Sequence, residues 1–163
     1  MSVSTINDLN PKALENFAQN VEQDPNKGEV NFAVTSQWQG GTKSVATVKN
    51  YRLGGVEYSR EFQIEADEPK ELLGTNTAPN PQELLLAALN ACMTVGFSAV
   101  ASLMGIELKS LEIKTSGTLD LRGFLDLNDT VNPGYDNVNF EVIISADASP
   151  EQLEELGGEP RYG

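Results

Sequence analysis

The chain has 163 residues, which suits one domain, and 39% of them are apolar, enough for a packed core. Its 24 acidic and 11 basic residues give a formal net charge of −13, which argues against partners with phosphate backbones or anionic lipid surfaces. The absence of histidine excludes a Ser-His-Asp triad, a histidine general base and a histidine-ligated metal. The single cysteine, Cys92, excludes an intrachain disulfide and a cysteine-rich zinc site. We expect neither a metal nor a cofactor.

The first part of the chain predicts one helix followed by a sheet. Apolar residues at helical spacing indicate a helix from Pro11 to about Glu22. Three stretches of alternating apolar and polar residues follow, at 29–39, 42–52 and 56–66, and glycine-rich turns separate them. This order is typical of an antiparallel meander. Among its aromatic residues, we expect Phe32 and Trp38 to lie in the core.

A long helix has the clearest start signal in the chain. Asn80 suits the N-cap, Pro81 suits the first helical position, and Glu83 stands where a capping box needs a carboxylate. The helix is predicted to run to Met104, with Gly105 at the C′ position. It would be about 36 Å long, which crosses a small domain.

The uncharged stretch 84–106 is long enough for a membrane span, but we expect a helix in the core of a soluble protein. Small polar residues recur along it every four residues, at Asn90, Thr94, Ser98 and Ser102. No basic segment followed by an apolar one is visible at the N-terminus. We therefore expect a cytoplasmic protein without a membrane partner.

After the helix, 106–125 reads as a long strand or a bent pair, 126–136 as a loop and 138–144 as a strand. A last helix is expected to begin at Ser149-Pro150 and to stop at Gly157-Gly158.

The organisation of the chain suggests an N-terminal helical segment, 1–27, and one domain, 28–163. One sheet in so short a chain covers only one side of the long helix, whose apolar residues lie on nearly every face. We therefore expect a homodimer in which two long helices lie side by side at a two-fold axis. The small polar stripe and Gly96 would allow close approach there; a partly solvated edge of a monomer is the alternative.

Cys92 lies about three turns inside the long helix, where a cysteine is most often a small apolar core residue. A reactive thiolate there would need a cation close by, since the helix N-terminus is too far away. The basic side chains with sufficient reach are Lys43, Arg52, Arg60 and Arg122. A thiolate paired with such a cation in an apolar pocket would attack the O–O bond of a peroxide.

The segment 80–92, with the sequence NPQELLLAALNAC, resembles the helix-cysteine segment of the OsmC/Ohr family. The loop 67–74, the Gly40-Gly41 turn and the Gly105-Ile106 pair are also similar to that family, and the resemblance extends over about residues 28–156. It implies an α+β fold in which antiparallel sheets pack around long central helices, in an intertwined homodimer.

The resemblance also implies chemistry, because active members reduce organic hydroperoxides with a thiolate, an arginine and a glutamate. A second cysteine then resolves the sulfenic acid. By position the thiolate is Cys92, but Gln82 stands in place of the glutamate, and Thr42, with Lys43 beside it, in place of the arginine. Glu83 is next to Gln82 but is better explained as a capping residue, and the second cysteine is missing.

Gln82 and Cys92 are ten residues apart, about 15 Å along one helix, so any partnership between them must cross the dimer. Three hypotheses remain. The chain is either a one-cysteine hydroperoxide reductase restored by an external thiol, or a non-catalytic relative that binds a small apolar or thiol ligand. A structural protein with an inert Cys92 is a weaker third. The candidate catalytic residues are Cys92, Gln82, Lys43, Arg52 and Arg60.

Overall fold

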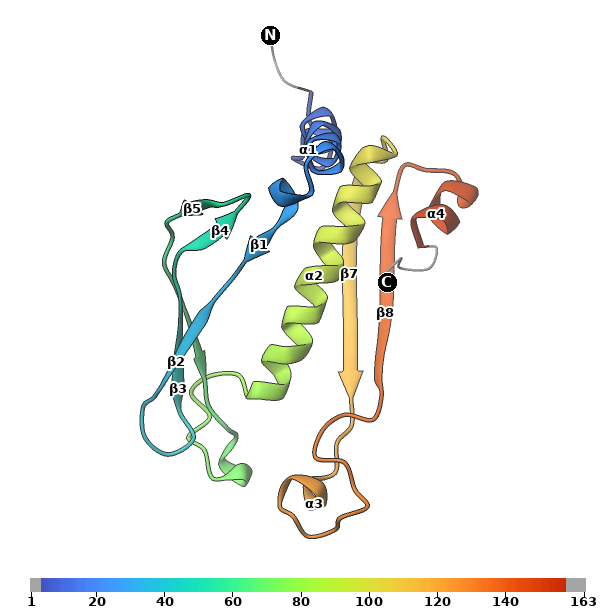
Figure 1. The fold of residues 1–163 in the computed structure, drawn as a ribbon. Helices are drawn as coiled ribbons and strands as arrows, with labels where there is room; N and C mark the ends of the chain where they lie inside the picture. Colours follow the sequence, from blue (N-terminus) through green and yellow to red (C-terminus); the bar gives the residue numbers. More distant parts are fainter. Residues whose placement is uncertain (1–3, 158–163) are drawn as a thin grey trace. The chain divides into compact units, whose positions relative to one another are not determined.

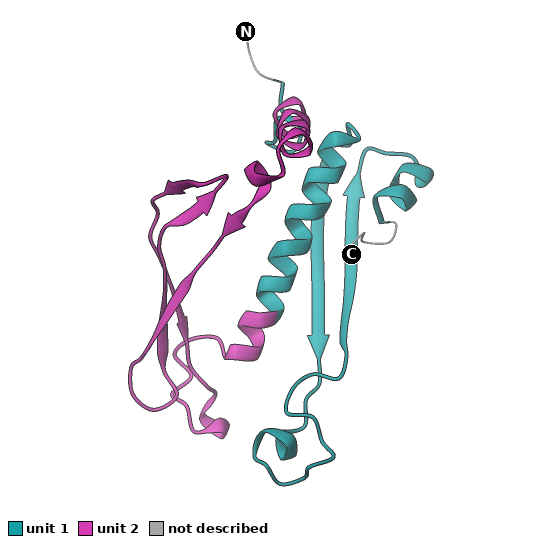
Figure 2. Ribbon diagram, in the orientation of Figure 1, with its two compact units in different colours: residues 1–10, 86–163 teal, residues 11–85 magenta. Residues whose placement is uncertain are grey.

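The computed structural model describes residues 4–157, and these form two compact units. Figure 2 colours them separately: one unit combines residues 1–10 with 86–163, and the other comprises residues 11–85. We call them the helix-hairpin unit and the meander unit. Their boundary falls inside the long helix α2, Pro81–Leu103. The division at residue 27 expected from the sequence stays a prediction.

The meander unit begins with helix α1, Pro11–Gln23, which confirms the predicted helix. A short 3₁₀ helix, η1, follows at Pro25–Gly28, and the Asp24 side chain caps it by accepting from the Asn26 amide. A Cβ on Gly28 would lie 2.6 Å from Val21 Cγ1, so glycine allows the close turn at the end of α1.

Six short antiparallel strands follow, in two three-stranded sheets of order β1-β4-β5 and β2-β3-β6, and a loop with the short 3₁₀ helix η2, Lys70–Leu72, then leads to the start of α2. The predicted meander is confirmed, although each expected strand is divided into two (Figure 1). The strands are β1 Val30–Asn31, β2 Val34–Trp38, β3 Ser44–Val48, β4 Tyr51–Leu53, β5 Val56–Tyr58 and β6 Phe62–Ala66.

A change of register explains the division. Val30 pairs with Leu53 and Val34 pairs with Val48, so four steps along one strand face five steps along its neighbour. One extra residue on one strand is typical of a β-bulge, which bends the strand and increases its twist. Alternation of apolar residues does not reveal such an insertion, and the sequence therefore predicted three continuous strands.

One face of the β2-β3-β6 sheet is apolar and largely exposed. Val34 and Trp38 share it with Phe62 and Ile64, because cross-strand partners and residues two apart lie on the same side of a sheet. Trp38 is 75% exposed and Phe32 is 61% exposed, so the expectation that both lie in the core is wrong for the single chain. Trp38 ends β2 and Phe32 lies between β1 and β2, so the single chain leaves both aromatic side chains accessible.

In the helix-hairpin unit, α2 lies alongside the antiparallel pair β7, Leu108–Gly117, and β8, Val138–Ala146 (Figure 1). The strand expected over 106–125 is therefore too long. After Gly117 the chain forms a short helix, α3, Leu121–Phe124, because Asp120 accepts a hydrogen bond from the Arg122 amide and caps it. The last helix, α4, Pro150–Gly157, begins where expected, and Gly158 of its predicted stop lies outside the described residues.

The core of this unit lies where α2 ends. Gly105, at φ +74°, lets the Ile106 amide donate to the Ala101 carbonyl at 2.8 Å, which confirms the predicted glycine C-cap. Ala101, Ile106 and Leu156 are buried together, so this cap also joins α2 to α4. Half-buried apolar neighbours surround them, namely Phe97, Met104, Leu108, Ile144, Ala146 and Ala148.

Among the described residues, α2 is the one helix long and apolar enough to span a membrane by length and composition. In the single chain it buries only Met93, Ala101 and Ser102. The helix is therefore less enclosed than a core helix, and several of its apolar side chains are accessible to a partner, namely Leu85, Leu89, Val95, Val100 and Leu103.

Candidate functional site

Cys92 lies in the middle of α2, on an exposed apolar face of the helix. At about 100° per residue, Leu89, Val95 and Leu103 lie within one broad stripe around it. These three side chains are 40%, 69% and 46% exposed. The Cys92 thiol is thus accessible and has apolar neighbours, so an apolar molecule that packs on this face of α2 would contact the sulfur.

The opposite face of α2 is fixed to the hairpin by Asn90. Its amide nitrogen donates to the Ile113 carbonyl at 3.3 Å, and its oxygen accepts from the Thr115 hydroxyl. Residues two apart on a helix point about 200° apart, so this attachment turns Cys92 away from β7. Asn90, the first residue of the polar stripe, is therefore used within the unit, and the expected helix-helix contact along the stripe stays a prediction.

A capping box starts α2, as the sequence predicted. The Asn80 amide donates to Glu83 Oε2 at 2.9 Å, and the Glu83 amide donates to Asn80 Oδ1 at 2.8 Å. Glu83 is thus committed to the helix start. Gln82, the residue before it, is half-buried in the first turn and brings no charge.

Asp67 is the most extensively hydrogen-bonded side chain near this helix start. It is only 1% exposed, and its Oδ1 accepts from the Thr42 hydroxyl at 2.7 Å. Its Oδ2 accepts from the amides of Thr75 and Thr77, both at 3.1 Å, and from their hydroxyls at 2.7 and 3.0 Å. The hydrogen bonds from the Thr75 and Thr42 hydroxyls, above all, hold the pKa of Asp67 well below its usual range.

This cluster brings two of the candidate residues into one part of the meander unit. Lys43 directly follows Thr42, and its amide donates to the Gly40 carbonyl at 3.1 Å in the β2–β3 turn. The Asp67 amide donates a hydrogen bond to the Pro79 carbonyl at 3.1 Å, and Gln82 lies three residues after Pro79. Asp67 therefore ties the segment with Lys43 to the segment with Gln82.

Arg60 lies at the other end of the same sheet. Its guanidinium carbon is 4.9 Å from the ring centre of Tyr51, 5.5 Å from Phe32 and 5.8 Å from Phe62. Strands β3 and β6 pair over five residues, so their two ends are about 13 Å apart. Arg60 precedes Phe62 at one end of this pair, and Lys43 precedes Ser44 at the other end. The meander unit thus does not bring Arg60 and Lys43 to one point. Within residues 4–157, no ion pair within 4.0 Å involves Arg60.

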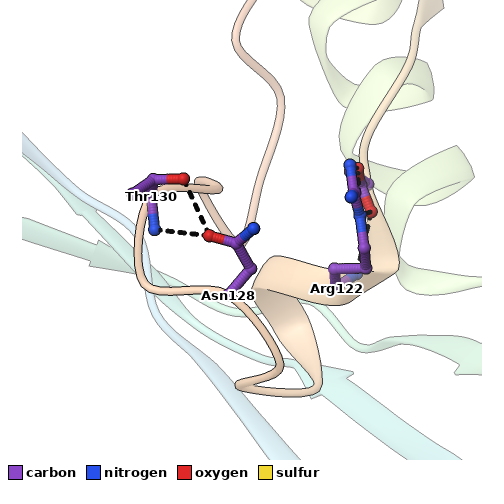
Figure 3. A network of polar contacts seen from close by, with 4 residues as sticks. Arg122, Asn128 and Thr130 are labelled. Atoms are coloured by element: carbon purple, nitrogen blue, oxygen red, sulfur yellow. Dashed lines mark hydrogen bonds and ion pairs between the residues drawn. The ribbon is translucent and has the colours of Figure 1, made fainter.

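Two further arginines of the described residues, Arg52 and Arg122, are near acidic residues. Arg52 is exposed on β4, opposite Glu57. Arg122 forms an ion pair with Asp120 at 2.5 Å (Figure 3), and the hydrogen bonds from Arg122 lower the pKa of Asp120 to about 2. This arginine belongs to the internal structure of the β7–β8 connection, where the Thr130 amide and hydroxyl also donate to the Asn128 side chain.

Sequence reasoning noted Asp67 only as the first residue of the loop 67–74 and did not single out its partners Thr75 and Thr77. A signal was present, because an aspartate followed by a glycine and two threonines in a loop offers a carboxylate acceptor and several donors. Gly74 is required there, since a Cβ would lie 1.8 Å from the Glu68 carbonyl oxygen. Among the described residues, no group of three acidic or cysteine side chains could hold a metal ion.

Comparison with known proteins identifies a family for the chain. The family model for OsmC-like proteins matches residues 74–157, more than half of the chain. The fold resembles an OsmC-like protein from Mycoplasma pneumoniae, with a TM-score of 0.56 and 21% identity over 77% of each chain.

It also resembles a protein of Psychrobacter arcticus described as an osmotic stress induced and detoxification response protein. The TM-score is 0.56 and the identity 15%, over 76% of this chain and 77% of that one. No curated protein sequence matches the chain. The family match, the capped helix with Cys92 and the mixed antiparallel fold agree with the resemblance seen in the sequence: the chain belongs to the OsmC-like protein family.

Proposed function

We propose that this protein is a thiol-dependent hydroperoxide reductase that uses Cys92 as its one redox-active residue. The observation that carries the proposal is the exposed thiol of Cys92 at the middle of the apolar face of α2, in a member of the OsmC-like family. Apolar surroundings favour an organic hydroperoxide over hydrogen peroxide, because the organic group gains burial against the helix.

The chemistry proceeds in two balanced stages. The Cys92 thiolate attacks one peroxide oxygen, so an S–O bond forms, the O–O bond breaks, and the leaving alkoxide takes a proton to become an alcohol. The sulfur is oxidised to a sulfenic acid by two electrons, which reduce the peroxide. An external thiol then attacks the sulfenic sulfur and releases water, and a second thiol reduces the mixed disulfide to restore Cys92.

The proposal includes a homodimer in the cytoplasm, where a free thiol stays reduced. The exposed apolar face of α2 around Ala91 and Val95 would be covered by a second copy. Gln82 and Cys92 are about 15 Å apart along one helix, so a shared site would combine Gln82 of one copy with Cys92 of the other.

Trapping the sulfenic acid tests the function directly. One equivalent of cumene hydroperoxide followed by dimedone should add one dimedone to Cys92, as measured by mass spectrometry. Excess peroxide without thiol should convert Cys92 to the sulfinic acid, since the sequence has no second cysteine to protect it. The matched control is Cys92→Ser, which keeps the size of the side chain but cannot attack. Peroxide consumption that survives Cys92→Ser would overturn the proposal.

The second candidate is a non-catalytic OsmC-like protein that binds a small apolar or thiol ligand. The observation in its favour is that Glu83 is used in the capping box, Gln82 is neutral, and Thr42 occupies its hydroxyl with Asp67. The rate of alkylation by iodoacetamide separates the two. A reductase needs a thiolate, so alkylation should remain fast at pH 6.5; a ligand-binding protein with an ordinary thiol should react slowly there.

A further inference from the structure

The cluster around Asp67 joins three segments that are distant in sequence. The carboxylate lies directly after β6, Thr42 lies in the β2–β3 turn, and Thr75 and Thr77 lie in the loop that leads to α2. All of them belong to the meander unit, residues 11–85. The proposed reaction does not use Asp67 itself.

Asp67 is buried without a cation. Its five hydrogen bonds with the three threonines all come from neutral amides and hydroxyls, and no ion pair within 4.0 Å involves it in the described part of the chain. A buried carboxylate is tolerated only when its acceptor positions are filled. The threonine donors are therefore held in place by the charge, and the loss of one donor weakens the arrangement of the others.

The two carboxylate oxygens of Asp67 accept hydrogen bonds from different segments of the chain. Oδ1 accepts from Thr42 in the turn, and Oδ2 accepts from Thr75 and Thr77 in the loop. The Asp67 amide donates to the Pro79 carbonyl, immediately before the capping residue Asn80. The path from the turn to the first residues of α2 thus runs through one residue, Asp67, by its side chain on one side and its backbone amide on the other.

The loop that closes around Asp67 has little freedom to adopt another conformation. The Asn76 amide donates to the Glu68 carbonyl at 3.0 Å, and the Gly74 amide donates to the Pro69 carbonyl at 2.9 Å. Gly74 also approaches the Glu68 backbone more closely than any Cβ would allow. Displacement of the carboxylate would therefore be transmitted along the loop rather than absorbed in it.

We propose that Asp67 is a positioning residue that couples the β2–β3 turn, with Lys43, to the start of α2, with Gln82. The coupling itself follows from the hydrogen bonds. Its catalytic consequence rests on the proposed function: a role of Gln82 in the Cys92 reaction would require that Asp67 holds the start of α2 in place.

Two threonine variants test the coupling from opposite ends. Thr42→Val removes the hydroxyl bond to Oδ1, and Thr75→Val removes one hydroxyl bond to Oδ2; both keep the shape of the side chain. Hydrogen exchange reports on each segment, through the Gln39 and Lys43 amides in the turn and the Thr75 and Thr77 amides in the loop. Thr42→Ser is the matched control, because it keeps the hydroxyl.

Each valine variant should accelerate exchange in both segments, and the effects in the double variant should be non-additive. Thr42→Ser should exchange as the wild type does. Acceleration confined to the substituted segment, with additive effects in the double variant, would overturn the coupling.

The activity measurement is separate. Thr42→Val should lower the rate constant of Cys92 oxidation by cumene hydroperoxide about tenfold, and Thr42→Ser should restore it. A wild-type rate in Thr42→Val, despite faster exchange in both segments, would overturn the positioning role. A wild-type protein that does not react at all would instead overturn the proposed function, and the exchange data would still decide the coupling.

Discussion

Asn80 and Glu83 exchange two hydrogen bonds across the first turn of α2, each accepting from the backbone amide of the other. This pair fixes where the helix begins. It also engages the carboxylate of Glu83, the acidic residue next to Gln82 in sequence, in a hydrogen bond. The first turn therefore presents a neutral amide where active relatives are expected to present a glutamate.

Replacing Asn80 tests the contribution of this cap. Asn80→Ala should lower the free energy of unfolding by about 1 kcal/mol, because the Glu83 amide loses its acceptor. Urea denaturation followed by circular dichroism measures the change. Asn80→Asp is the matched control and should stay close to the wild type, since its side chain still accepts the bond. Equal stability of Asn80→Ala and the wild type would show that the cap contributes little.

Asn7 makes a second polar connection that can be tested. Its amide nitrogen donates to the Ile106 carbonyl at 2.9 Å, and its oxygen accepts from the Leu108 amide at 2.8 Å. Asn7→Ala should destabilise the protein by about 1–3 kcal/mol, because partly buried backbone groups lose their partners. Thermal unfolding measures the loss. The exposed neighbour Asp8 provides the control, and Asp8→Asn should change the midpoint little.

The parts of the structure that local rules govern could be predicted from the sequence. Asn80, Pro81 and Gly105 mark the ends of α2 through capping chemistry that involves only neighbouring residues. The division of the meander strands could not be predicted, because a one-residue bulge leaves the alternation almost unchanged. The helix α3 was missed for a similar reason, since four residues carry too little periodicity to be recognised.

The candidate site shows the same limit. The position of Cys92 on α2 follows from the sequence, but the direction in which it points depends on Asn90 bonding to β7, a contact between residues 23 apart in sequence. The role of Asp67 was missed although Thr75 and Thr77 follow it in the same loop, because its third donor, Thr42, comes from a turn 25 residues earlier that no local pattern joins to this loop.

The stability of the protein should depend on Asp67 at low pH. Its pKa lies well below the ordinary value of 3.8 in the folded state, so protons bind this group in the unfolded chain first as the pH falls. The stabilising contribution is therefore present above about pH 4 and is progressively lost below it. Urea unfolding of the wild type and of Asp67→Asn at pH 6 and pH 3 should show a smaller difference at pH 3. A difference that stays constant or grows would contradict this assignment.

Gln82→Glu tests the proposed chemistry by adding a carboxylate in the first turn of α2. A carboxylate there can orient a basic side chain against the thiolate through a charge-assisted pair. The single-turnover rate of Cys92 oxidation by cumene hydroperoxide should rise, by about tenfold if one such pair forms. The control is Glu83→Gln, which keeps a capping-box side chain and should not raise the rate. An unchanged rate in Gln82→Glu would place Gln82 outside the reacting groups.

The proposed dimer depends on the exposed apolar face of α2. Val95 is 69% exposed beside Cys92, and Val95→Glu would place a charge in the interface. Sedimentation at micromolar concentration should show twice the 17.6 kDa mass for the wild type and a shift toward the single-chain mass for Val95→Glu. Ser116→Glu adds the same charge at an exposed position of β7 and should leave the dimer intact.

The same variants connect assembly to chemistry. If a second copy completes the site, Val95→Glu should lose both the dimer and the dimedone adduct of Cys92 at low protein concentration, and raising the concentration should restore both together. Ser116→Glu should retain both. A wild-type protein that sediments only at 17.6 kDa yet still forms the adduct would separate the two proposals, because the thiol would then react without a partner copy.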